Sequence, residues 1–293
     1  MLIDIHTHVT PTITVKRPDG STYCTPKQLL AMLDEAGIDM AVLLPTISPE
    51  WGTRRVGPEE VLDIAAEYPD RFIPFCNLDP RMVNNTPAAD FMPILEWYRN
   101  AGCKGVGEIT ANMPFDDPMV WNMLGQCAKA EMPVLFHIGP RLGGCYGLID
   151  DLGLPRLEKT LAQFPDLTII GHSQPFWSEI GADVTNETRG GYPKGKVTPG
   201  RIVELLRKYP SLHCDLSAGS GHNAVSRDPE FGYAFMEEFQ DRLFFGTDIC
   251  APHNKTPLVD FLNDAGATGM ISSEAFEKIS WRNANRVLGL GLG

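Results

Sequence analysis

Two histidines near the start of the chain have the spacing of a metal-binding pair. His6 and His8 end an apolar segment that begins at Leu2. Residues i and i+2 of a β-strand point to the same face, so the two imidazoles would converge on one point if this segment is a strand. Neutral imidazole is the commonest metal ligand in proteins. A strand that merely ends in two solvated histidines shows the same pattern, so the prediction depends on the rest of the chain.

Four further side chains of metal-binding types stand where other short apolar segments end. They are one glutamate, two histidines and one aspartate. Imidazole nitrogens together with carboxylate oxygens suit zinc, manganese, nickel or iron. The sequence therefore predicts a divalent metal site, with zinc as the first expectation. The predicted ligands are His6, His8, Glu108, His137, His172 and Asp248.

The segments that carry these residues alternate with amphipathic helices. Apolar segments typical of buried strands cover residues 2–8, 40–44, 72–78, 104–109, 134–138, 167–172, 212–216 and 243–247. Apolar residues at helical spacing predict helices at about 25–36, 58–68, 88–100, 118–130, 155–164, 199–209, 230–239, 258–263 and 273–288.

This alternation predicts parallel βαβ units, and eight such units form a (β/α)8 (TIM) barrel. We expect one barrel domain over residues 1–293. An open doubly wound sheet is the alternative, but no expected strand is followed by G-x-G-x-x-G or G-x-x-x-x-G-K. Barrel enzymes have their active sites at the C-terminal ends of the strands, which is where the candidate ligands stand.

Loops are expected to supply the contacts with a substrate. Residues 173–198 form the longest segment without a predicted element, and such an insertion is often a lid. We expect substrate contacts from four loop residues, Arg54, Arg141, Trp177 and His222. Arg141 lies in a glycine-rich loop and suits bidentate contact with a carboxylate.

Composition narrows the class of partner. The formal net charge of −12 argues against nucleic acid and anionic membranes, which leaves a small-molecule substrate. The 7 cysteines are scattered without a C-x-x-C motif, so we expect a reducing, cytoplasmic location. We expect neither a membrane span nor a signal peptide. The oligomeric state is left open, with a homo-oligomer among the alternatives.

The pattern of strand-end residues resembles the amidohydrolase superfamily of metal-dependent barrel enzymes. The resemblance spans Leu2 to about Leu290. It is carried by His6-Thr7-His8, His137, His172 and Asp248, while Phe245–Asp248 and Asn283–Leu290 are similar to the amidohydrolase-related (amidohydrolase 2) branch. The resemblance implies a TIM barrel and a metal-dependent reaction. It does not separate hydrolases and lactonases from decarboxylases.

Glu108 leaves the number of metal ions open. Binuclear members often have a carboxylated lysine at the end of strand four, and a glutamate there resembles the TatD-like members, where it is a ligand. We expect Glu108 to face the barrel mouth because it shares a strand face with Val106. A single ion would use His6, His8, His137 and Asp248. Two ions would add Glu108 and His172, and a hydrogen bond from a ligand histidine to Glu108 is the rival role.

Hydrolysis of a small ester, lactone or amide is the leading interpretation. A bound divalent ion lowers the pKa of its water to about 7 and polarises a carbonyl. Asp248 would take the proton of the water and pass it to the leaving group, while His172 would bind a second ion or stabilise the oxyanion. The alternative is non-oxidative decarboxylation of an unsaturated or aromatic acid, with His172 as general acid or base. A non-catalytic binding protein is the third class, which the complete ligand set disfavours.

Overall fold

Eight parallel strands form the centre of the molecule, as the sequence predicts. The computed structural model describes residues 1–17, 19–52 and 54–293. The barrel strands are β1 (Ile3–Thr7), β2 (Met40–Leu43), β3 (Phe72–Pro74), β4 (Val106–Ile109), β5 (Val134–Gly139), β7 (Ile169–His172), β8 (Leu212–Asp215) and β9 (Leu243–Phe244). The short strand β6 (Leu148–Ile149) pairs with β5.

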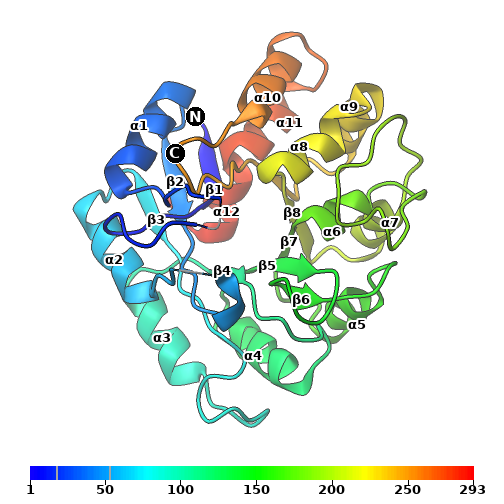
Figure 1. Cartoon of the computed structure of the whole chain (residues 1–293). Helices are drawn as coiled ribbons and strands as arrows, with labels where there is room; N and C mark the ends of the chain where they lie inside the picture. Colours follow the sequence, from blue (N-terminus) through cyan, green and yellow to red (C-terminus); the bar gives the residue numbers. More distant parts are fainter. Residues whose placement is uncertain (18, 53) are drawn as a thin grey trace.

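The strands pair in chain order and close into a ring. One run has the order β1-β2-β3, and the other has the order β4-β5-β7-β8-β9. A parallel bridge from Cys76 to Val106 joins β3 to β4, and a second from Thr7 to Ile249 joins β1 to the segment after β9. The backbone N–H of Asp248 donates to His6 O over 2.8 Å at the same seam. The molecule is therefore a TIM barrel, with its helices arranged around the strands (Figure 1).

The helices follow the predicted positions, with additions in the loops. Each of the first seven barrel strands is followed along the chain by a helix before the next begins. The helical segments are α1 (Pro26–Ala36), η1 (Pro49–Trp51), α2 (Pro58–Glu67), α3 (Met92–Asn100), α4 (Pro118–Lys129), α5 (Pro155–Gln163), α6 (Gln174–Ser178), α7 (Arg201–Lys208), α8 (Ala218–Ser226), α9 (Pro229–Glu238), α10 (Pro257–Ala267), α11 (Ser273–Glu277), η2 (Lys278–Arg282) and α12 (Asn283–Leu288). Among the described residues, no helix is both long and apolar enough to cross a membrane.

Local sequence accounts for where helix α1 begins and ends. The Thr25 hydroxyl accepts a hydrogen bond from the Gln28 N–H, and the Gln28 side chain accepts one from the Thr25 N–H, so the two form a capping box. Pro26 occupies the first turn, where a missing N–H costs nothing. Gly37 ends the helix with φ 68°, a conformation that favours glycine.

Strand residues alternate between two apolar clusters, and this alternation aims the site residues inward. Residues such as Leu43 and Phe136 pack in the cluster that includes the surrounding helices. Leu135 and Ile170 belong to the inner cluster, which α12 residues join at its edge. His137 and His172 stand two residues beyond these inner residues, so they share the inner face of the barrel.

Two strands depart from simple alternation where site residues lie. In β1 the register with β2 shifts between Asp4 and Thr7, and in β4 the register with β5 shifts between Val106 and Ile109. The prediction that Glu108 shares a face with Val106 is therefore wrong. Val106 packs in the outer cluster, whereas the irregularity turns Glu108 toward the barrel axis.

The insertion at 173–198 is a folded segment anchored on the barrel. It begins with α6, and two buried residues within it, Glu179 and Arg189, form an ion pair with an N–O distance of 3.0 Å. Arg189 also donates to Asp150 O over 2.9 Å, and Glu179 accepts from the Gly153 N–H over 2.8 Å. These contacts hold the insertion against the segment that follows β6.

Candidate metal centre

The two histidines of β1 converge as their spacing predicts. Their Nε2 atoms lie 3.1 Å apart, and both side chains are buried. The Nδ1 atom of His8 lies 3.0 Å from the carbonyl of Leu44, which can only accept a hydrogen bond. His8 therefore carries its proton on Nδ1 and directs the lone pair of Nε2 toward His6.

The carboxylates of Glu108 and Asp248 each lie close to both of these histidines. Glu108 Oε2 lies 3.8 Å from His6 Nε2 and 3.6 Å from His8 Nε2. Asp248 Oδ1 lies 3.6 Å and 3.7 Å from the same two nitrogens. Ligands about 2.0–2.2 Å from one tetrahedral ion are separated by roughly 3.4 Å. His6, His8 and Asp248 therefore form a group that could hold a divalent ion, while Glu108 lies within 3.8 Å of both β1 histidines and also groups with His137 and His172.

A second group shares Glu108 with the first. His137 Nδ1 lies 2.8 Å from Glu108 Oε1, and His172 Nε2 lies 4.0 Å from the same oxygen. His172 Nε2 is also 3.9 Å from Asp248 Oδ2. All six predicted ligands thus lie together at one end of the barrel, and Glu108 stands between His6 and His8 on one side and His137 on the other.

The electrostatics of this cluster favour a positive charge. Burial lowers the pKa of His6, but Asp215, Asp248 and Glu108 outweigh it and raise that pKa to about 10. Burial raises the pKa of Glu108, but the histidines around it prevail and hold that pKa well below its usual range. Burying such carboxylates is costly without a compensating cation, which a proton or a metal ion can supply.

Asp215 is a site residue that the sequence interpretation missed. It is fully buried at the end of β8, and its Oδ2 lies 2.6 Å from His6 Nδ1 and 3.2 Å from His172 Nδ1. The signal was present, because Asp215 stands at the same strand-end position as the predicted ligands. The predicted strand extends to Leu216, which places Asp215 inside the strand and not at its end, whereas β8 ends at Asp215.

Asp4 supports the site through the backbone. Its carboxylate accepts hydrogen bonds from the His6 N–H over 2.9 Å and from the Thr247 N–H over 3.0 Å. The hydroxyl of Thr247 donates to the second oxygen. Burial raises the pKa of Asp4 to about 7 although these hydrogen bonds oppose the shift. Asp4 therefore ties the start of the barrel to the segment that carries Asp248.

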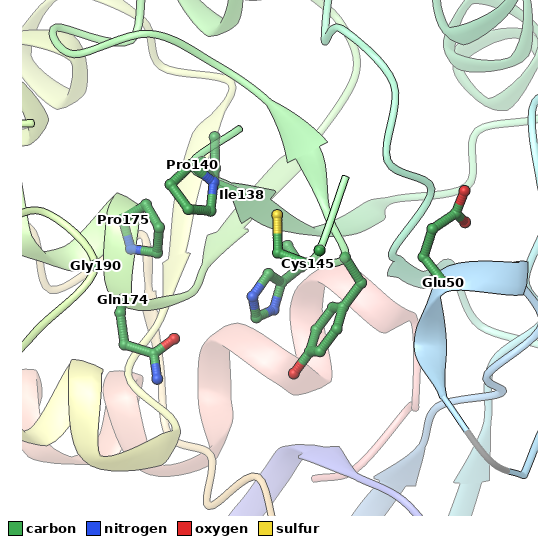
Figure 2. A pocket seen from close by; sticks show the side chains of 10 residues that line it. Glu50, Ile138, Pro140, Cys145, Gln174, Pro175 and Gly190 are labelled. Carbon is green, nitrogen blue, oxygen red and sulfur yellow. The ribbon is translucent and has the colours of Figure 1, made fainter. Parts of the chain in front are cut away.

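A cavity of about 540 Å³ opens beside the cluster. His137 is among its lining residues, Gln174 and Pro175 lie on one side and Glu50 lies on the other (Figure 2). Asp248, whose side chain is 29% exposed, is the most accessible of the acidic groups at the centre. A small molecule in the cavity can therefore contact His137, which belongs to the cluster.

Aromatic rings that the sequence interpretation did not select surround this approach. The Tyr146 ring lies 4.5 Å from that of His137 and 5.0 Å from that of Trp51, measured between centroids. Trp51 in turn lies 4.9 Å from His8. Burial first, and then the carboxylates of Glu108 and Asp248, raise the pKa of Tyr146 well above its usual value, so its hydroxyl stays protonated.

The four predicted substrate contacts have different surroundings. Arg54 forms an ion pair with Glu60 at 2.6 Å, so its charge is already matched. Arg141 is exposed on a loop whose Gly144 and Cys145 line the cavity. His222 lies on α8, edge-on to Phe261. None of these three side chains forms part of the cavity wall in the portion of the chain that is described.

The prediction that Trp177 contacts a substrate is wrong, because its side chain is only 1% exposed. Its Nε1 donates to Asp215 O over 2.8 Å, and its ring packs on Phe176 and Phe235. The expectation came from its place in the long insertion. Its indole instead packs in the apolar core and forms a hydrogen bond with the last residue of β8.

The fold and this cluster define a (β/α)8 barrel with a candidate divalent metal centre at the C-terminal ends of its strands. The sequence matches the amidohydrolase family (Amidohydro_2) over residues 3–290, and the chain belongs to this family of enzymes. A search of curated protein sequences finds no match.

Solved structures share the whole fold at low sequence identity. An uncharacterized TIM-barrel protein from Bordetella bronchiseptica has a TM-score of 0.65 and 20% identity, with 98% of each chain covered. An amidohydrolase from Burkholderia multivorans with bound zinc has a TM-score of 0.62 and 14% identity, with 99% of each chain covered. A dihydroxybenzoic acid decarboxylase from Polaromonas sp. JS666, with bound manganese and the inhibitor 2-nitroresorcinol, has a TM-score of 0.61 and 17% identity over 100% of this chain and 98% of that chain.

Proposed function

We propose that this protein is a metal-dependent hydrolase that acts on the carbonyl group of a small ester, lactone or amide. The observation that carries the proposal is the convergence of His6 and His8, 3.1 Å apart, with oxygens of Glu108 and Asp248 that lie 3.6–3.8 Å from both nitrogens, next to a cavity lined by His137. In this proposal the four ligands of the first ion are His6, His8, Glu108 and Asp248. Glu108 Oε1, His137 and His172 offer a place for a second.

Zinc is the proposed ion, since two imidazoles and two carboxylates form a four-coordinate set that suits it. Manganese, iron and nickel accept the same ligand types. An ion at this place would lower the pKa of a bound water and polarise the substrate carbonyl. The protein's contribution is to hold the ligands and to exclude bulk water from a buried centre.

Asp248 is the proposed proton carrier. One of its oxygens faces the two β1 histidines, and the other lies 3.9 Å from His172 Nε2. Its partial exposure lets the carboxylate take a proton from the attacking water and release it to the leaving group. His172 is the neighbouring group that can stabilise the developing oxyanion or hold the second ion.

Arg17 is the proposed contact for an anionic group on the substrate, with Arg141 at the rim of the cavity as a second. The Arg17 side chain lies in the loop after β1, 3.0 Å from Cys250 Sγ and above the ring of Tyr23. Its charge opposes the rise that burial causes in the pKa of Tyr146, which supports a position of Arg17 near that ring.

Decarboxylation of an aromatic or unsaturated acid is the second candidate function. It is favoured by the Trp51 and Tyr146 rings beside His8 and His137, because such rings can stack on a planar substrate. In this case His172 would deliver the proton that replaces the carboxylate on the substrate carbon.

A substrate panel separates the two functions. The zinc-loaded protein would be incubated with lactones, aryl esters and hydroxybenzoic acids, and both acid release and CO2 release would be measured. The proposal predicts hydrolysis that is absent from Asp248→Asn, whereas CO2 release without hydrolysis would replace it with the decarboxylase function.

Cysteine chemistry and charge support the remaining proposals on location and partners. All 7 cysteines are free, and five of them are buried. We infer a reducing, cytoplasmic environment and a small-molecule substrate, with no role for nucleic acid or membrane surfaces.

A further inference from the structure

One buried carboxylate contacts two histidines of the candidate metal centre. Asp215 Oδ2 lies 2.6 Å from His6 Nδ1, 2.7 Å from Ser217 Oγ and 3.2 Å from His172 Nδ1. The other oxygen, Oδ1, accepts the backbone N–H of Ser217 over 2.8 Å. The carboxylate is thus surrounded by groups that must donate to it.

The direction of each hydrogen bond follows from this arrangement. An ionised carboxylate only accepts, so His6 must carry a proton on Nδ1 and the Ser217 hydroxyl must point to Asp215. Both oxygens of Asp215 act as acceptors, Oδ1 for the Ser217 N–H and Oδ2 for the Ser217 hydroxyl. Since the single hydroxyl proton of Ser217 is used in this way, Ser217 Oγ can only accept from His172 Nδ1, 3.0 Å away.

We propose that Asp215 is a positioning residue that sets His6 and His172 in the same tautomer, with the proton on Nδ1 and the lone pair of Nε2 directed at the centre. Ser217 transmits this choice to His172. For His6 the inference rests on the proposed metal function, because the Nε2 lone pair is the ligand. For His172 it stands alone, because the contacts with Ser217 and Asp215 involve no metal.

A glycine preserves the space that this carboxylate needs. A Cβ atom on Gly246 would lie 2.7 Å from Asp215 Oδ1 and 2.9 Å from Ser217 Cβ. Close packing against Asp215 and Ser217, rather than turn geometry, therefore explains why position 246 is a glycine. A side chain at this position would push the carboxylate away from both histidines.

The variant Asp215→Asn tests the proposal, because an amide presents both an acceptor and a donor. Its oxygen would stay on the Ser217 N–H, which places the NH2 group against both Nδ1 atoms. A donor there favours the opposite tautomer, with the proton on Nε2. We expect 15N NMR of the metal-free protein to show His172 protonated on Nδ1 in the wild type and on Nε2 in the variant.

Zinc affinity supplies the second measurement. We expect Asp215→Asn to bind zinc roughly 10- to 100-fold more weakly than wild type, because His6 no longer offers its lone pair. Gly246→Ala should change both readouts in the same direction while leaving every hydrogen-bonding group in place, and it serves if Asp215→Asn does not fold. Asp228→Asn is the matched control, since Asp228 is a buried carboxylate that accepts a backbone N–H from Val197 away from the centre.

The outcomes are separable. An unchanged His172 tautomer together with zinc affinity within twofold of wild type in both Asp215→Asn and Gly246→Ala would overturn the proposal. A wild-type protein that binds no zinc would refute the proposed function, and the tautomer of His172 would still decide the role of Asp215.

Discussion

At the scale of single residues, the partner of each Nδ1 atom decides which ring nitrogen of a β1 histidine is free to bind a metal. His8 donates through Nδ1 to Leu44 O, and the Nδ1 atom of His6 lies against the carboxylate of Asp215. Both therefore expose Nε2 to the same point, where Glu108 and Asp248 contribute oxygens. We expect Glu108 and Asp248 to have different roles, because Glu108 is buried beside His137 whereas Asp248 is partly exposed.

Replacing Glu108 with glutamine should weaken metal binding. The amide keeps the shape of the side chain but loses the charge, and it cannot both receive the His137 Nδ1–H and serve as an anionic ligand. We expect the zinc stoichiometry of Glu108→Gln to fall by one equivalent in titrations followed by elemental analysis. Unchanged stoichiometry and affinity would leave Glu108 as a hydrogen-bond partner of His137 only and would favour a single-ion, decarboxylase-like site.

Asp248→Asn should abolish turnover without unfolding the protein. The amide cannot take up the proton, and loss of a general base typically costs 10²- to 10⁴-fold in rate. Turnover would be followed on the best substrate of the panel and folding by circular dichroism. If the variant retains wild-type activity, the proton carrier is another group, with His172 next in line.

At the scale of elements, regular features of the barrel were predictable and irregular ones were not. The eight strands and the cap of α1 follow from apolar periodicity and from Thr25, Gln28 and Gly37. The register shifts in β1 and β4 left no signal in the sequence, because a bulge depends on pairing with the neighbouring strand. The correct inward aim of Glu108 was therefore predicted for a wrong reason.

The same limit applies to the loop residues. The sequence shows that Arg54 and Trp177 lie in loops at the catalytic end, but it does not show what pairs with them. Glu60 pairs with Arg54, and the core encloses Trp177. Tyr146 was not predicted because loops place side chains by long-range packing, which has no periodic pattern.

The insertion offers a prediction at this scale. Arg189→Met would leave the buried carboxylate of Glu179 without its partner, and breaking a buried pair typically costs about 3–5 kcal/mol. Burial already raises the pKa of Glu179 to about 7, so partial protonation will reduce the loss toward the lower end of that range. Urea unfolding would measure it.

The matched control for this variant is Arg207→Met, which removes a surface ion pair with Glu238. Exposed pairs contribute roughly 0–1 kcal/mol, so its loss should be small. Adding Glu179→Gln to Arg189→Met should recover part of the stability. Equal, small losses in the two single variants would show that the buried pair does not anchor the insertion.

At the scale of the whole molecule, the polar site and the apolar packing of the barrel interior lie in different parts of the barrel. The C-terminal ends of the strands carry the polar cluster, while the inner apolar residues pack with α12. His213 belongs to the apolar part, because its ring is buried and stacked on Phe244. Family membership and the barrel fold were both predicted correctly from the strand-end pattern.

His213 should make the protein less stable in acid. Burial lowers its pKa from 6.5 to about 4, so the folded state favours the neutral ring. The associated stability is therefore complete above pH 6.5 and declines as the pH falls through 6.5 toward 4, by about 3 kcal/mol in total.

Comparing wild type with His213→Gln by urea unfolding at pH 7, 5 and 4 measures this contribution. The difference in unfolding free energy between the two proteins should shift in favour of the variant as the pH falls. The exposed His253, replaced with glutamine, provides the control and should show no such trend. A pH-independent difference between wild type and His213→Gln would contradict the assignment.

The central claim, a divalent ion held by the strand-end side chains, is tested most directly by anomalous diffraction from crystals of zinc-loaded protein. The account predicts a peak at the zinc edge enclosed by His6, His8, Glu108 and Asp248, with any second peak beside His137 and His172. Fully loaded crystals whose anomalous peaks lie only at other places would contradict it.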